Sequence, residues 1–191
     1  MSSFSDPKAI ADYAENATRR VPGLNDVHRM AALLLAERTP PHGRVLVVGA
    51  GGGMELKFFA ESFPDWHFDG VDPSAEMLDL AKTALGPLVS RVRLHHGYVE
   101  AAPEGPFDAA SCLSTLHFTA EAERYRTLCE IHKRLKPGGV FVAMHYSISQ
   151  DSAERELWLS RCAAFAISSG VEPEHARTAA VAIGKQLPVL S

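Results

Sequence analysis

Short apolar runs alternate with segments of helical periodicity through most of the chain. The first run, Arg44–Val48, is almost wholly apolar, which is typical of a strand buried on both faces. Strands are expected over residues 44–48, 67–71, 91–95, 107–112 and 140–145. Strands that alternate with helices pair in parallel through crossover connections. The pattern therefore predicts an α/β fold with a doubly wound, mostly parallel sheet in three α/β/α layers.

Helix signals separate and flank these strands. Asp6-Pro7 predicts a first helix that runs to Ala17, and Asn25 is expected to cap a second helix, which ends at Pro40. Further helices are expected over residues 54–63, 74–86 and 120–135, and two more after the last strand, over 151–170 and 173–184.

Size and composition predict one globular domain. Its 191 residues divide into an N-terminal helical cap (1–40), a core (41–147) and a helical lid or dimer element (148–191). A net charge of −4 and a pI near 6.1 give no general attraction for phosphate backbones, so we expect no nucleic-acid partner. We find neither an apolar run of membrane-spanning length nor a signal-peptide pattern, so we expect a cytoplasmic protein without a membrane partner.

The three cysteines are scattered along the chain and lack the spacing of metal ligands. They are Cys112, Cys129 and Cys162. We expect free thiols, as in a reducing compartment, and no metal site.

A glycine-rich turn follows the first expected strand, in the run VLVVGAGGG (45–53). Glycine permits positive φ angles and lets the backbone approach a ligand closely, although a merely tight turn is the alternative. A dinucleotide site has the pattern GxGxxG, whose third glycine would fall at Met54. The pattern here is GxGxG, which favours the phosphate-free ligand S-adenosylmethionine (SAM) over NAD.

Asp72 ends the second expected strand. A carboxylate at this place can accept hydrogen bonds from both hydroxyls of a ribose, a feature that NAD sites also use. Asp72 therefore predicts a ribose site without selecting the cofactor. The alternative is an aspartate that only caps a helix before Pro73.

Five segments, in order, resemble the successive motifs of the class I SAM-dependent methyltransferases, which have a Rossmann-like fold, and they span residues 40–147. They read VLVVGAGGG (45–53), GVDPSAEML (70–78), HHGYVEAAP (95–103), FDAASCLSTLHF (107–118) and LKPGGVFVAMH (135–145). The run YAENATRRVPG (13–23) is similar to the N-terminal segment of a subgroup that includes carboxy-SAM synthases.

The resemblance implies an enzyme that uses SAM to methylate a small-molecule substrate. Two alternatives stay open. One is a carboxy-SAM-synthase-like enzyme or a non-catalytic SAM-binding protein, and the other is an NAD-dependent oxidoreductase.

The resemblance also implies a role for each matching position. The methionine part of SAM would lie along Gly49, Ala50, Gly51 and Gly53, and its ribose on Asp72. The adenine would lie beside Pro73, Met77, Gly97, Tyr98 and Val99, and the sulfonium above Cys112, Leu113 and Ser114.

A few polar residues outside these motifs are further candidates. His117 is a candidate general base, with a purely structural loop histidine as the alternative. Arg20, with Arg19 and Tyr13, could reach a carboxylate of SAM or of the substrate, since arginine grips carboxylates bidentately.

Two positions depart from the family pattern. Val47 stands where an acidic residue usually faces the SAM ammonium indirectly. Tyr98 stands where an acidic residue often meets the adenine amino group, and its ring could stack on or cover the adenine instead.

The C-terminal part is shorter than the resemblance implies, because the family's seven-stranded sheet ends in an antiparallel hairpin of strands six and seven. Five strands are expected here, and too few residues follow them for that hairpin. Truncation or natural shortening would each leave an exposed strand edge, and activity could be lost with the absent part. We therefore expect a homodimer, or terminal helices rearranged to cover the edge.

Overall fold

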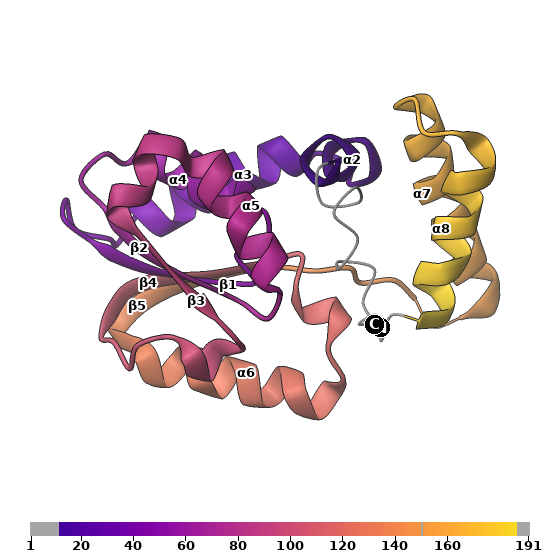
Figure 1. Ribbon diagram of the computed structural model, residues 1–191. Helices are drawn as coiled ribbons and strands as arrows, with labels where there is room; N and C mark the ends of the chain where they lie inside the picture. Colours follow the sequence, from indigo (N-terminus) through magenta and orange to yellow (C-terminus); the bar gives the residue numbers. More distant parts are fainter. Residues whose placement is uncertain (1–11, 150, 187–191) are drawn as a thin grey trace.

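A single parallel sheet organises the molecule, a computed structural model that describes residues 12–149 and 151–186 (Figure 1). Its strands have the order β3-β2-β1-β4-β5, and every neighbouring pair is parallel. The bounds are β1 (Arg44–Val48), β2 (His67–Asp72), β3 (Val92–His96), β4 (Phe107–Leu113) and β5 (Leu135–Met144). The predicted α/β fold with a parallel sheet is confirmed.

Helices cover both faces of the sheet, with α3, α4 and α5 on one side and α6 on the other (Figure 1). The longer helices are α2 (Tyr13–Arg20), α3 (Leu24–Ala36), α4 (Met54–Ser62), α5 (Ala75–Leu85), α6 (Glu121–Arg134), α7 (Ser152–Ser168) and α8 (Pro173–Gln186). Short 3₁₀ helices span η2 (Gly86–Arg91), η3 (Val99–Ala101) and η4 (Leu116–Phe118).

Two apolar clusters fill the spaces between these layers, because successive strand residues face opposite sides of a sheet. Val45 and Val47 point into the cluster beneath α3 and α4, which also contains Phe59. Leu46 points into the cluster on the α6 side, together with Ile131. Both faces of β1 are thus buried, as its apolar sequence predicts.

The N-terminal helices differ from the prediction. The start expected at Asp6-Pro7 lies outside the described residues, and α2 continues to Arg20 instead of ending at Ala17. Helix α3 begins at Leu24 behind Gly23, whose φ of 69° places it in the left-handed region, so Asn25 is a helical residue and not the cap. Glycine adopts that conformation without steric cost and so sets the start of the helix.

The last strand also differs from the prediction. It begins at Leu135, five residues before the expected start at residue 140, and includes the turn-like sequence Pro137-Gly138-Gly139. Leu135 pairs with Phe107, and after a register shift Val140 pairs with Ala109. The prolyl-glycyl segment is therefore an irregularity within the strand, and His145 lies after the strand and not within it.

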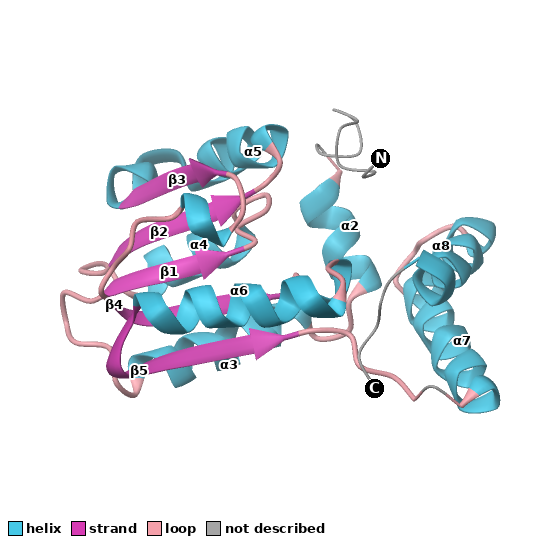
Figure 2. Cartoon of the chain, turned by 90° about the horizontal axis from the view of Figure 1, so that it is seen from below, coloured by secondary structure: helices cyan, strands magenta, loops and turns pink. Residues whose placement is uncertain are grey.

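The last two helices lie beyond the carboxyl ends of the strands (Figures 1 and 2). Asp151 caps α7, since its Oδ1 accepts hydrogen bonds from the backbone N–H groups of Ala153 and Glu154. Helix α7 packs against α8 and α2. In the described part of the chain no strand pairs with the outer edge of β5, and α7 and α8 lie away from it. None of the described helices has the length and apolar character that crossing a membrane would need.

Candidate functional site

The glycine loop, residues 49–53, turns the chain sharply at the carboxyl end of β1. The backbone N–H groups of Gly49 and Ala50 both donate to the carbonyl oxygen of Val71, at 2.9 and 3.0 Å. Gly49, Gly51 and Gly53 all have positive φ angles. A Cβ added at Gly49 would lie 2.0 Å from Oγ1 of Thr115, so this position needs glycine both for its φ angle and for space. The tight glycine turn that the sequence predicted is therefore present.

Asp72 connects the end of β2 to this loop. Its Oδ2 accepts a hydrogen bond from the backbone N–H of Gly51, and its Oδ1 accepts one from the backbone N–H of Ser74, both at 2.9 Å. Ser74 in turn caps α5, accepting from the N–H of Met77 at 3.2 Å. Burial raises the pKa of Asp72, although these hydrogen bonds act in the opposite direction. Each carboxylate oxygen keeps a lone pair for a further donor.

Tyr13 brings α2 over the glycine loop. Its ring carbons would lie 3.2 Å from a Cβ added at Gly52, and its hydroxyl 3.7 Å from one added at Gly51. Burial raises the pKa of the Tyr13 phenol, and the nearby carboxylates of Glu55 and Asp72 raise it further. Tyr13 thus lies close to the glycine loop and within electrostatic range of Glu55 and Asp72.

Glu55 is a buried acidic residue next to the glycine loop that the sequence analysis did not single out. It lies in the first turn of α4, two residues after the loop, and only 6% of its surface is exposed. Ser111 in β4 donates a hydrogen bond from Oγ to Oε1 of Glu55 at 2.7 Å. Burial raises the pKa of Glu55 to about 8. The sequence did contain a signal for the burial of Glu55, because this residue lies on the same helix face as the apolar Leu56 and Phe59, which are buried.

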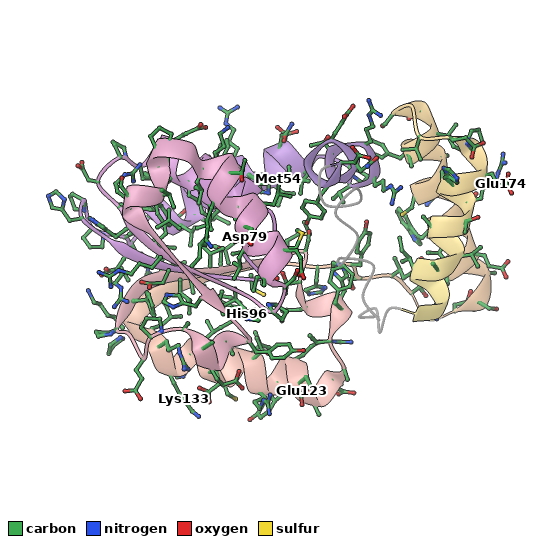
Figure 3. All side chains as sticks on the ribbon, viewed as in Figure 1. Met54, Asp79, His96, Glu123, Lys133 and Glu174 are labelled. Atoms are coloured by element: carbon green, nitrogen blue, oxygen red, sulfur yellow. The ribbon has the colours of Figure 1, made fainter. Side chains whose placement is uncertain are left out.

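The residues predicted to flank an adenine lie at the end of β3. Gly97 has a φ of 141° and donates its backbone N–H to the carbonyl oxygen of Asp72 at 2.9 Å. Tyr98 is 65% exposed, whereas Val99 is buried. His96, labelled in Figure 3, fixes the neighbouring loop through a 3.0 Å hydrogen bond between Nε2 and the carbonyl oxygen of Pro73.

Met77 lies between this group and the glycine loop. It is buried, and its Cε would lie 3.5 Å from a Cβ added at Gly51. The structure thus brings the predicted ribose and adenine positions to the same edge as the glycine loop.

The end of β4 reaches the same edge. Cys112 and Leu113 are buried, and burial is the main cause that raises the pKa of the Cys112 thiol to about 12. Ser114 has a φ of 54°, which is uncommon for a residue other than glycine. Its N–H donates to the carbonyl oxygen of Met144 at 2.7 Å, which anchors this conformation. Strained backbone of this kind is often found at functional sites.

His117 follows in η4 and is almost fully buried. Its Nδ1 accepts a hydrogen bond from the backbone N–H of Tyr146 at 3.3 Å, and the two rings meet edge to face at 4.7 Å. Burial, with the charges of His145 and Arg124, lowers the pKa of His117 to about 4. The ring is therefore neutral at pH 7, and its proton resides on Nε2.

Arg20 is not brought to the glycine loop. Tyr13 and Arg20 are at opposite ends of α2, about 10 Å apart along the helix axis. Arg20 instead lines a cavity of about 40 Å³ with Tyr146 and residues of α7 and α8. Arg19 forms an exposed ion pair with Glu15 at 2.5 Å.

Other hollows and clusters in the described residues lack site chemistry. A larger hollow of about 540 Å³ lies between α7 and α8, away from the glycine loop, and its lining is mostly apolar. Within residues 12–149 and 151–186, no group of three His, Cys, Asp or Glu side chains is arranged to hold a metal ion.

The middle of the chain matches a known protein family. Residues 45–139 match the family model described as a methyltransferase domain. A carboxy-S-adenosyl-L-methionine synthase from Campylobacter fetus is 23% identical over 146 residues, which cover 76% of this chain and 62% of that protein. A dTDP-3-amino-3,6-dideoxy-alpha-D-glucopyranose N,N-dimethyltransferase from Streptomyces fradiae is 33% identical over 123 residues, which cover 61% of this chain and 46% of that protein.

A solved structure agrees with these matches. SAM-bound CalS10, an amino pentose methyltransferase from Micromonospora echinaspora, is 27% identical with a TM-score of 0.59, and the match covers 78% of this chain and 60% of that one. The chain spans just over three fifths of the length of the first curated relatives that it matches, 62% and 63%.

Proposed function

We propose that this chain, whose residues 45–139 belong to the class I SAM-dependent methyltransferases, binds SAM and transfers its methyl group to a small-molecule acceptor. The glycine loop and Asp72 would hold the cofactor at the carboxyl edge of the sheet, where open α/β sheets bind their ligands. Amino-sugar methyltransferases among the relatives support a small polar acceptor.

The hydrogen bond between Asp72 and Gly51 carries this proposal. This hydrogen bond fixes the carboxylate of Asp72, which would bind the ribose, relative to the glycine loop. One lone pair on each carboxylate oxygen stays available for a ribose hydroxyl. The loop lacks the third glycine of the dinucleotide pattern GxGxxG, and Glu55 is buried in the first turn of the helix that follows the loop. A carboxylate behind the loop favours a cationic amino acid over a pyrophosphate, which supports SAM over NAD.

The remaining predicted contacts follow from this placement. We propose that Gly49, Ala50, Gly51 and Gly53 line the methionine part, while the adenine lies by Met77, Pro73, Gly97, Tyr98 and Val99. The exposed ring of Tyr98 would cover the adenine. At the end of β4, Cys112, Leu113 and Ser114 would lie beneath the sulfonium.

SAM supplies an activated methyl group on a good leaving group, so the protein needs mainly to align the acceptor and exclude water. Positioning of this kind can contribute about 7–11 kcal/mol to catalysis. His117 is the proposed polar group near the acceptor. With its pKa lowered to about 4 and its Nδ1 engaged, it suits the role of hydrogen-bond donor through Nε2 better than that of a general base at pH 7.

The N-terminal and C-terminal helices would close over the site. Tyr13 already covers the glycine loop, and α7 and α8 stand beside α2 at the carboxyl edge of the sheet (Figure 2). Arg20, at the junction of α2 with α7 and α8, would reach a ligand carboxylate only if these helices shift when the ligand binds.

A second candidate function is the synthesis of carboxy-SAM. The match to the Campylobacter fetus enzyme over 146 residues favours it, and that match is weaker in identity than the match to the sugar methyltransferase. Mass spectrometry of any ligand that copurifies with the protein distinguishes carboxy-SAM from SAM by its mass.

We also propose that the protein forms a homodimer and is located in the cytoplasm. The outer edge of β5 is unpaired in the described residues, which favours a homodimer formed at that edge. Cys112, Cys129 and Cys162 are all free thiols, which fits the reducing cytoplasm.

Titration calorimetry tests the proposed function directly. We expect SAM and S-adenosylhomocysteine (SAH) to bind one molecule per chain, and NAD to give no binding heat. Incubation with methyl-labelled SAM and nucleotide-linked amino sugars then tests transfer, which liberates SAH. Binding of NAD in preference to SAH would refute the proposal.

A further inference from the structure

Among the described residues, Glu55 has no cationic partner that would balance its charge in the unliganded protein. A buried carboxylate is costly unless it is paired or receives several hydrogen bonds. Glu55 receives a hydrogen bond from a neutral hydroxyl, that of Ser111, and among the ion pairs of residues 12–149 and 151–186 none involves Glu55. Burial accordingly raises its pKa to about 8, so the carboxyl is mostly protonated at pH 7.

The groups that face Glu55 add no positive charge. Tyr13 approaches from α2 and Cys112 from β4, and the pKa of each is raised in part by the charge of Glu55. The charge of Asp72, at the end of β2, also raises the pKa of the same phenol. On α3, His28 faces Phe58, one turn further along α4, and burial lowers the pKa of His28, so this histidine is neutral at pH 7 as well.

The sheet order places Glu55 on one particular side of the ligand. β2, β1 and β4 are neighbours, so Asp72, the glycine loop and the Glu55–Ser111 pair follow one another across the sheet. If the ribose lies on Asp72, the amino-acid end of the ligand extends across the loop toward β4. Ser111 also pairs in register with Val47, so the carboxyl of Glu55 lies beside the strand that leads into the loop.

We propose that Glu55 is the counter-charge for the α-ammonium group of the bound cofactor, and that it releases its proton to solvent when the cofactor binds. This inference rests on the proposed function, because it assumes that SAM and SAH occupy the glycine loop. The step breaks the O–H bond of the carboxyl, the proton passes to buffer, and the resulting carboxylate faces the ammonium group of the ligand. Glu55 is a positioning and electrostatic group and takes no part in the transfer of the methyl group.

Binding of three ligands with different charges shows which ligand charge Glu55 faces. SAM carries a sulfonium and an ammonium, SAH carries only the ammonium, and methylthioadenosine carries neither. We expect Glu55→Gln, a variant of nearly the same shape, to weaken SAM and SAH by at least tenfold at pH 8.5 and methylthioadenosine by less than twofold. Glu61→Gln, on the exposed face of the same helix, is the matched control and should bind all three like the wild type.

Proton release gives a second, independent readout. Calorimetry with SAH at pH 7, in phosphate and in Tris, measures the protons exchanged with the buffer. We expect nearly one proton released per SAH in the wild type and close to none in Glu55→Gln. Ser111→Ala keeps the carboxyl but removes the hydroxyl that stabilises its charge, so the pH at which SAH affinity rises should move upward.

Thermal melts verify that the variants are folded. Three results would overturn the proposal. Equal weakening of all three ligands in Glu55→Gln would overturn the proposal, since it would indicate a general structural effect. Weakening of SAM alone would also overturn it, because the carboxylate would then face the sulfonium. Unchanged affinity and unchanged proton release would overturn it as well. Failure of the proposed function is distinguishable, because it would appear as an absence of SAH binding in the wild type.

Discussion

The carboxylate of Asp72 accepts a hydrogen bond from the backbone N–H of Gly51, over a distance of 2.9 Å. The end of β2 and the loop that follows β1 are therefore fixed to each other before any ligand arrives. Ser74 adds a second backbone donor to the same carboxylate, at 2.9 Å. Such preorganisation lowers the entropy lost when a nucleoside binds, because the carboxylate is already held in one orientation.

Replacing Asp72 by Asn should weaken SAH binding. One oxygen of the side chain becomes an amide nitrogen, which cannot accept from Gly51 or Ser74, and a ribose hydroxyl loses its acceptor. We expect a loss of about 1–3 kcal/mol in binding free energy, measured by calorimetry. The control is Asp79→Asn on α5 (Figure 3), where an exposed ion pair with Lys82 is lost and affinity should be unchanged. Equal affinities for the two variants would argue against ribose binding by Asp72.

Replacing Gly49 by Ala should destabilise the fold itself. The new Cβ would collide with Thr115 and would also impose a positive φ on alanine, so we expect a loss of about 2–4 kcal/mol in unfolding free energy. Gly138→Ala is the matched control, since its φ is 78° against 76° for Gly49 and nothing lies within 4 Å of the added Cβ. That variant should lose about 1–2 kcal/mol, from backbone strain alone. Denaturant titration that gives the same loss for both variants would contradict the close contact with Thr115.

His117 should make the protein sensitive to acid. Its pKa is lowered from 6.5 to about 4 in the folded state, so the unfolded chain binds the proton more readily. The stability from the neutral ring is present above pH 6.5 and is lost as the pH falls toward 4, at up to about 1.4 kcal/mol per pH unit. His117→Gln should flatten this part of the stability curve, whereas replacement of the exposed His67 should not. A wild-type slope retained in His117→Gln would reject the assignment.

Glu55 should have the opposite effect in the unliganded protein. Its pKa is raised from 4.5 to about 8 on folding, so the folded state binds the proton more readily than the unfolded state. The contribution of Glu55 to stability should therefore fall as the pH rises from 4.5 toward 8, by up to about 1.4 kcal/mol per unit, which opposes the His117 contribution below pH 6.5. Glu55→Gln should be free of this decline and be the more stable protein at pH 8. Parallel stability curves for the two proteins over this range would show that the carboxyl titrates normally.

In residues 12–149 and 151–186 no strand pairs with the outer edge of β5, which predicts self-association at this edge. Light scattering should give a mass of twice 20.7 kDa if two copies pair at this edge. Ala143 is exposed on β5, and Ala143→Lys should shift the protein toward monomer, because charged edge strands resist pairing. A wild-type mass of one chain at high concentration would exclude the dimer.

Local signals in the sequence predicted much of the site. The apolar run before GAGGG, the glycines themselves and the aspartate at the end of β2 each express a backbone requirement, and the structure has them as expected. The helix expected over residues 74–86 is present as α5 for the same reason, because its Ser74 cap depends on a neighbour three residues away, Met77.

Features that depend on tertiary packing could not be predicted in this way. The hydrogen bond between the buried Glu55 and Ser111 joins residues 56 positions apart. The lowered pKa of His117 depends on burial and on the charges of His145 and Arg124, which lie in other segments of the chain. The start of β5 at Leu135 was also missed, because Pro137-Gly138-Gly139 has the composition of a turn and only pairing with β4 makes it part of a strand. Gly23 replaced Asn25 at the start of α3 because a left-handed glycine already sets the direction of the chain.

A crystal structure of the chain with SAH is the most direct test of the whole interpretation. The ribose hydroxyls should lie within hydrogen-bond distance of the two oxygens of Asp72, with the amino-acid end of SAH over residues 49–53. SAH bound elsewhere, or a glycine loop still covered by Tyr13 with no density for the ligand, would contradict it.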